Sequence, residues 1–277
     1  MKTATTCFYA LLLFLFLFPL SSFAQEKKMY YLTVTTAHRN FAVENPKFDE
    51  WLALEKEYFE KVVKKNEFII GHNVLNHYFT ADNSEIIFVN VYENWDAIDK
   101  AWTKNQDLVK QAWPDENARK AFFEKRNKYY VPNHSDEIYV TYGDRKGLAK
   151  APEKPMVYYV RKSIFATPKD GTGKEFDECN KELFDNLAMK NDVLKAYYAY
   201  NHAWGSNNME FVEVFVVDAL GDLEKAWDKD DELFKAKWKD EKAREAFSKK
   251  YDKYFTGQHA DYVYRSVPEL LKMVSKK

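Results

Sequence analysis

Residues 118–129 read ARKAFFEKRNKY, and residues 243–254 read AREAFSKKYDKY. The step of 125 residues between these two stretches also relates Asn76-His77 to Asn201-His202. Between positions 76 and 139 the two copies align without a gap, and about two in five positions are identical. An internal match of this length predicts that the chain is built from two copies of one fold.

Each copy shows the same succession of strand and helix patterns. In the first copy the expected strands cover 30–36, 68–80, 85–92 and 138–142. The helices expected between them begin after Asn45-Pro46, after the capping residue Asn94, and at Pro114, which suits a first helical turn. In the second copy the expected strands cover 157–164, 194–204, 210–217 and 262–266, and the helices cover 174–189, 220–237 and 240–255.

This order, β-α-β-β-α-β with the second helical region broken in two, is that of a ferredoxin-like unit. We therefore predict an α+β chain of two tandem ferredoxin-like repeats. Repeat 1 is expected over 25–146, a linker over 147–155, and repeat 2 with a short C-terminal tail over 156–277. The Gly, Pro, Lys and Ala of 143–155 favour an exposed connection.

The element order and the duplication resemble the dimeric α+β barrel superfamily, over nearly the whole mature chain. That superfamily includes antibiotic-biosynthesis-type monooxygenases, NIPSNAP-like proteins and chlorite-dismutase-like haem proteins. The resemblance implies that the two ferredoxin-like sheets pair face to face as an intramolecular dimeric α+β barrel, with ligands inside. No residue pattern selects one of these families, so no catalytic residue is carried over.

The N-terminus, 1–24, has the features of a secretory signal peptide. Lys2 precedes an apolar run over 10–20, and Ser22 and Ala24 form a small-residue cleavage site before Gln25. The run is too short to favour a membrane span. We therefore expect an exported protein, periplasmic or secreted, with no membrane span after cleavage.

Composition excludes some partners and some chemistry. The formal charge is −1 with acids and bases interspersed, so no basic stripe for nucleic acid is expected. Cys179 is the one cysteine after the cleavage site, so no internal disulfide is expected. It lies at helical spacing with Phe176 and Leu183, which indicates a buried apolar residue.

Side-chain alternation in the third strand of each copy separates two faces. The aliphatic face, expected to meet each copy's own helices, carries Ile87, Val89 and Val91, matched by Val212, Val214 and Val216. The face expected to line the barrel carries Phe88, Asn90 and Tyr92, matched by Glu213, Phe215 and Val217.

Arg161 and Glu213 form a candidate charged pair. A step of 127 between the first strands aligns Val34 with Arg161, and Phe88 aligns with Glu213. The first and third strands are neighbours in a ferredoxin-like sheet, so opposite charges that replace an apolar pair predict direct contact. Two interpretations remain open: a compensating ion pair, or a polar anchor in an aromatic cavity.

The repeated Asn-His dipeptide supplies two equivalent histidines, His77 and His202. Strand alternation places them on an aromatic face with Phe79 in the first copy, and with Tyr200 and Trp204 in the second. This face suits the barrel interior. The histidines could donate structural hydrogen bonds, contact a ligand, or bind a metal or haem iron, although no zinc-like ligand spacing accompanies them.

Three functions remain open. The chain could bind a small apolar or aromatic molecule inside the barrel. It could instead be a cofactor-independent monooxygenase or a haem-handling enzyme, by fold analogy. It could also be a structural protein whose barrel is filled by its own side chains. No cofactor is expected, with haem as the alternative.

Overall fold

The computed structural model describes residues 28–43 and 47–274. Repeat 1 contains β1 (Tyr31–Arg39), α1 (Phe48–Tyr58), the π-helical turn η1 (Phe59–Val63), β2 (Gly71–Phe79), β3 (Glu85–Tyr92), α2 (Trp95–Ala112), α3 (Glu116–Asn127) and β4 (Tyr130–Lys146). Repeat 2 contains β5 (Val157–Phe165), α4 (Gly173–Leu183), η2 (Phe184–Ala188), β6 (Ala196–Trp204), β7 (Glu210–Val217), α5 (Asp222–Lys237), α6 (Glu241–Asp252) and β8 (Phe255–Ser266). A short 3-10 turn, η3 (Pro268–Leu270), follows β8.

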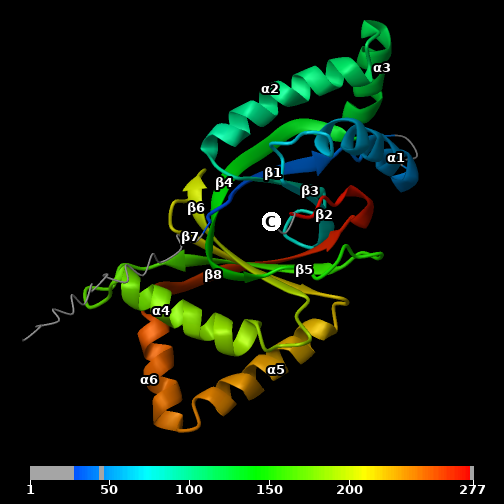
Figure 1. Ribbon diagram of the computed structural model, residues 1–277. Coiled ribbons are helices and arrows are strands. Elements are labelled where there is room, and N and C mark those ends of the chain that lie inside the picture. The colour runs from blue at the N-terminus through cyan, green and yellow to red at the C-terminus, as the bar shows by residue number, and fades with distance from the viewer. Residues whose placement is uncertain (1–27, 44–46, 275–277) are drawn as a thin grey trace, which may run out of the picture.

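The eight strands form one closed antiparallel barrel in the order β1-β3-β2-β8-β5-β7-β6-β4 (Figure 1). Each repeat contributes four neighbouring strands, and the two sheets join along their edges through β2–β8 and β4–β6. Helices α1, α2 and α3 cover one side of the barrel, and α4, α5 and α6 cover the opposite side (Figure 1). The predicted fold class, two tandem ferredoxin-like repeats in an intramolecular α+β barrel, is confirmed.

Several boundaries differ from the predictions. β4 begins at Tyr130, eight residues before the expected start, and its polar, exposed first half is held by pairing with β1. Asn94 caps α2 as predicted, because its side chain accepts a hydrogen bond from the amide of Ala97. Pro114 lies outside α3, since Asp115 is the N-cap.

The barrel interior is filled. One cluster takes side chains from strands of both repeats and none from the helices, so it occupies the centre of the barrel. Its buried members are Leu75, Ile87, Leu148, Met156, Tyr158, Ala196, Val216 and Tyr264. Leu271 and Met273, which follow β8, pack against the same cluster. The expectation of a ligand inside the barrel is therefore corrected: aromatic and aliphatic side chains meet there.

The two faces of the third strands are the reverse of the prediction. Val89 and Val214 belong to the interior cluster. Tyr92 and Phe215 belong instead to clusters that contain helix residues. A strand covered on both faces is apolar on both, so its alternation does not tell which face meets the helices.

The copies also align differently from the prediction in their first strands and first helices. Tyr31 pairs with Tyr92 and Val157 pairs with Val217, so β5 follows β1 by 126 positions and Arg161 corresponds to Thr35. α1 and α4 are related by 125 positions, which aligns buried Trp51 with buried Phe176. A shift of one residue in a strand moves every side chain to the other face.

Candidate functional site

His77 and His202 lie on opposite walls of the barrel, each at a seam between the repeats. His77 is opposite Tyr264 in the β2–β8 pair, and His202 is opposite Tyr139 in the β4–β6 pair. His77 Nδ1 lies 2.8 Å from Thr80 Oγ1, so this histidine has a local structural bond. His202 Nε2 is buried without a hydrogen-bond partner among the described residues.

The tyrosines opposite the two histidines join the repeats. The hydroxyl of Tyr139 donates to Glu210 Oε2 at 2.8 Å, and the hydroxyl of Tyr264 donates to Glu85 Oε2 at 3.1 Å. Each bond joins one repeat to the other at equivalent positions. The histidines beside these tyrosines therefore belong to the contact that closes the barrel, and the structure does not bring them together as a ligand pair.

Other predicted residues are dispersed. Tyr200 stacks against Tyr198, a member of the filled interior, and Trp204 is 69% exposed at the barrel rim. Tyr92 lies under the helices, where its hydroxyl is 3.4 Å from Thr33 Oγ1. The expectation that Asn90 and Tyr92 line the barrel is therefore wrong.

Arg161 and Glu213 are direct cross-strand neighbours, as predicted, and the partner of Glu213, Tyr197, belongs to a cluster that includes helix residues of repeat 2. Arg161 Nε forms its ion pair with Asp261 Oδ1 at 3.2 Å. Glu213 Oε1 accepts a hydrogen bond of 2.7 Å from the hydroxyl of Tyr197. Burial raises the pKa of Glu213, while Tyr197 and Arg161 act in the opposite direction. The pair thus belongs to the helix–sheet layer of repeat 2.

The helix–sheet layer of repeat 1 holds a larger polar group, which we name the repeat-1 polar layer: Arg39, Trp51, Glu55, His72, Asn90, Arg126 and Tyr130. Glu55 is 3% exposed. Arg126 Nη2 donates to Glu55 Oε2 at 2.9 Å, and Arg126 Nε lies 2.9 Å from Oε1. Tyr130 donates to Oε1 at 2.7 Å and accepts a 2.8 Å hydrogen bond from Trp51 Nε1. The buried carboxylate therefore accepts one hydrogen bond on each oxygen, from Arg126 and from Tyr130, and a buried charge requires such partners.

The electrostatics of this group reflect its burial. Burial alone would lower the pKa of Arg126, but Glu55 and Tyr130 outweigh it and raise that pKa above its usual value. Burial, together with Glu55, also raises the pKa of Tyr130 well above its usual value. Glu55 and Arg126 therefore form a charged pair beside a tyrosine that stays protonated.

His72 lies further along the same layer and is neutral. Its ring stacks on Phe59, and Nδ1 lies 2.7 Å from Asn90 Oδ1. Burial lowers the pKa of His72 to about 4. In the neutral ring Nδ1 donates to Asn90, which leaves Nε2 as an acceptor.

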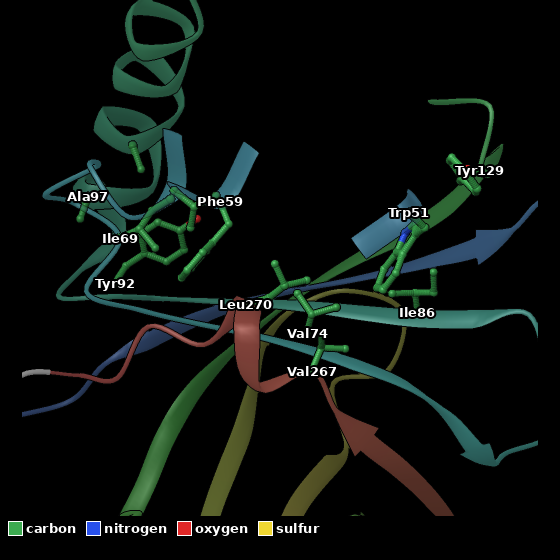
Figure 2. Packing of buried hydrophobic residues seen from close by; sticks show 12 residues of the cluster. Trp51, Phe59, Ile69, Val74, Ile86, Tyr92, Ala97, Tyr129, Val267 and Leu270 are labelled. Carbon is green, nitrogen blue, oxygen red and sulfur yellow. The ribbon is translucent and has the colours of Figure 1, made fainter. Parts of the chain in front are cut away.

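His72 borders a small inner cavity of about 30 Å³. Its walls include Glu55, Tyr58, Phe59, Arg126 and Leu270. Leu270 is 1% exposed and comes from η3, at the end of repeat 2. Figure 2 shows it beside Val74 of β2. A residue of repeat 2 thus helps to close the cavity of repeat 1.

The polar layer also reaches an open hollow at the barrel rim, which we name the mouth hollow. It has a volume of about 480 Å³ and is lined by residues that include His38, Arg39, Phe41, Asp82, Ser84 and Asn133. The hollow is broadly open to solvent. Arg39 belongs both to the mouth hollow and to the polar layer, since its guanidinium lies 4.9 Å from the centroid of the Trp51 ring.

Repeat 2 has largely aromatic residues at the positions of the polar layer. Arg39, Trp51, Glu55, His72, Asn90, Arg126 and Tyr130 correspond to Phe165, Phe176, Asn180, Tyr197, Phe215, Tyr251 and Phe255. Phe176 stacks on Tyr251 at 5.7 Å between centroids, and Phe165 stacks on Phe255 at 5.5 Å. The same fold therefore packs without the charged group, so the polar layer is not a requirement of the fold.

Neither the inner cavity nor the packed barrel interior has the room that a haem needs. The inner cavity has about the volume of one water molecule in the liquid, roughly 30 Å³. The barrel interior is packed, and His77 and His202 lie on separate seams. Within 28–43 and 47–274, no three His, Cys, Asp or Glu side chains are grouped to hold a metal ion.

Comparisons with known proteins bear on the fold alone. No protein-family model and no curated protein matches the chain. A solved structure named "Putative monooxygenase" from Fusobacterium nucleatum subsp. nucleatum ATCC 25586 aligns with a TM-score of 0.52 and 12% identity, over 86% of this chain and 92% of that one. A mutant chlorite dismutase from Candidatus Nitrospira defluvii aligns with a TM-score of 0.49 and 9% identity, over 88% of this chain and 94% of that one. The chain thus has the dimeric α+β barrel fold that its element order indicated.

The sequence analysis did not identify the polar layer. Glu55 and Arg126 occur among many Glu and Lys residues of amphipathic helices, where a charge usually faces solvent. One signal was present: His72 and Asn90 differ from Tyr197 and Phe215 at matched positions. A search for matched positions that are polar in one copy and aromatic in the other would have identified this layer.

Proposed function

We propose that the chain is an exported protein that binds a small molecule in repeat 1, at the mouth hollow, with the repeat-1 polar layer behind it. The carrying observation is the difference between the repeats. Repeat 1 keeps an open hollow that meets a buried polar group, whereas repeat 2 has packed aromatic rings at the equivalent positions. Repeat 2 folds without this polar group, so folding does not explain why repeat 1 has it. We therefore assign the group to binding.

Export rests on the signal-peptide pattern of 1–24, which lies outside the described residues. No helix that the structure describes has the length and apolar character to cross a membrane. Expression of the full-length chain should yield a mature protein that begins near Gln25 and is found outside the cytoplasm. Cell fractionation with N-terminal sequencing tests this, and an uncleaved cytoplasmic chain would contradict it.

Binding is favoured over proton-abstraction chemistry. A general base works best when its pKa is near the operating pH. His72 borders the inner cavity with a pKa of about 4, so near neutral pH it suits hydrogen-bond acceptance better than proton abstraction. His77 and His202, the histidines that the sequence made candidates, lie on the seams.

The binding proposal is tested with residues 25–277, purified from the exporting host and examined by native mass spectrometry. A co-purifying small molecule is expected on this chain. It should be lost from the triple variant His38→Ile, Arg39→Phe and Ser84→Met, which takes the residues of repeat 2. The matched control, Asn207→Asp with Met209→Ser, changes the equivalent mouth of repeat 2 and should keep the molecule. If the molecule stays on the triple variant, or if none is found, the proposal fails.

A further inference from the structure

Arg39 is a cation without an acidic partner among the described residues. Its Nη2 donates to Asn76 Oδ1 at 2.9 Å, and its guanidinium packs on the Trp51 ring. The other arginine of the polar layer, Arg126, is paired with Glu55. A partly enclosed guanidinium that has no acidic partner among the described residues keeps unused donors there, since the group carries five N–H bonds.

The fold itself does not require this charge. Phe165 occupies the equivalent position in repeat 2, where it stacks on Phe255 and contacts Phe176. An aromatic residue would therefore fit the packing, and burial lowers the pKa of Arg39, which marks a cost of enclosing the charge. An anion from solution would offset that cost.

The other polar side chains of the mouth hollow, His38, Asp82 and Ser84, interact with one another. Asp82 Oδ1 accepts hydrogen bonds from Ser84 Oγ at 2.6 Å and from the Ser84 amide at 2.8 Å. Asp82 Oδ2 lies 3.1 Å from His38 Nδ1. The Asp82 carboxylate thus has local partners on both oxygens, whereas the Arg39 guanidinium keeps free donors for a ligand.

The rim of the hollow is partly apolar. Phe41 is 62% exposed and Val131 lies on the same wall. Arg39 and Phe41 line the same hollow. An exposed aromatic ring can hold the apolar body of a ligand whose charged end meets an arginine.

We propose that the mouth hollow binds a small carboxylate with an aromatic or other apolar body, whose carboxylate meets Arg39 and whose body lies against Phe41. This inference rests on the proposed function and names its ligand class. A planar guanidinium forms paired hydrogen bonds with a carboxylate, which a neutral amide of the same shape does not reproduce.

Benzoate and benzamide are suitable probes, because they share a ring and differ in charge. Each is titrated into residues 25–277 and followed by NMR shifts of the Trp51 indole, which lies under Arg39. Benzoate should bind and benzamide should bind at least about tenfold more weakly. Arg39→Gln should weaken benzoate by a similar factor. Arg161→Gln, which removes an arginine of repeat 2, should leave the affinity unchanged.

Arg39→Phe is the second variant, because Phe165 shows that the fold accepts this residue; it should also lose benzoate. Equal binding of benzoate and benzamide would overturn the carboxylate inference and leave the binding proposal standing. The carboxylate inference would also be overturned if both Arg39 variants still bind benzoate, or if the unmodified chain does not bind it. The co-purifying molecule, measured separately, decides the proposed function.

Discussion

The helix–sheet layers of the two repeats are built from the same order of elements but from different side chains. In repeat 1 the layer contains the pair Glu55–Arg126, with Glu55 3% exposed. In repeat 2 the same positions hold Asn180 and Tyr251, and Tyr251 stacks on Phe176. One fold therefore tolerates either a buried ion pair or an aromatic cluster between its helices and its sheet. Positions where the two copies of one fold carry different side chains therefore indicate which side chains serve a function, and this comparison requires no homologous protein.

The largest effect is expected when the buried ion pair loses one partner. Arg126→Met leaves the Glu55 carboxylate buried with too few donors, which should lower the free energy of unfolding by about 3–5 kcal/mol. The double variant Glu55→Asn with Arg126→Tyr, which takes the residues of repeat 2, should recover much of that loss. Urea unfolding of the three proteins measures both quantities. If the double variant is as unstable as Arg126→Met, repeat 1 does not accept the residues of repeat 2, and the two layers are not interchangeable.

The next effect concerns acid stability in repeat 1. The pKa of His72 is about 4 in the folded chain against an ordinary value of 6.5, so the unfolded chain takes up a proton first as the pH falls. The contribution of His72 is complete above pH 6.5 and is lost between pH 6.5 and about 4, by about 3 kcal/mol. His72→Tyr and His72→Gln should both flatten this part of the stability profile, measured by urea unfolding at each pH. An unchanged slope in both variants would show that His72 is not buried and neutral.

Repeat 2 should respond to pH in the opposite direction. Burial raises the pKa of Glu213 above its ordinary value of 4.5, so its contribution is complete below pH 4.5 and is lost as the pH rises through the folded pKa. Glu213→Gln cannot ionise and should raise the melting temperature more at pH 8 than at pH 4. Arg161 keeps Asp261 as its partner in this variant. If the melting temperature rises equally at both pH values, the stabilisation does not come from removing the ionisation of Glu213.

The smallest effect is expected from Arg161→Met. Arg161 is paired with Asp261 at 3.2 Å, and both side chains are about 40% exposed, so solvent weakens their attraction. The loss should be at most about 1 kcal/mol, as for other exposed ion pairs. Thermal unfolding compares this variant with Arg126→Met. A loss as large as that of Arg126→Met would mean that Glu213 depends on Arg161, as in the compensating ion pair that was one of the two interpretations of the sequence.

Much of the architecture could be predicted because its signals are local. The β3 strand, Glu85–Tyr92, has the predicted bounds, and Asn94 caps α2 as expected. The start of β4 was missed because its first half is polar, and only pairing with β1 makes it a strand. Arg161 and Glu213 were correctly predicted as neighbours, since neighbouring strands follow from element order.

The candidate site was less predictable. Asn90 was singled out, but for the wrong face, and His72 was not among the predicted site residues although the two are hydrogen-bonded. Glu55 and Arg126 are 71 residues apart in the chain. No periodicity in either helix indicates that these two charges meet in a closed layer, because contact between helices α1 and α3 is a long-range property.

The sequence by itself determined the duplication, the order of elements in each copy and hence the fold class, because repetition and periodicity are written in neighbouring residues. Only the tertiary structure decided which face of each strand meets the helices, that the barrel is filled, and that Leu270 of the second copy closes a cavity of the first. The reason is that a strand with apolar residues on both faces can turn either face toward the helices, and its own sequence does not select one. Closing the barrel through β2–β8 and β4–β6 fixes one of them.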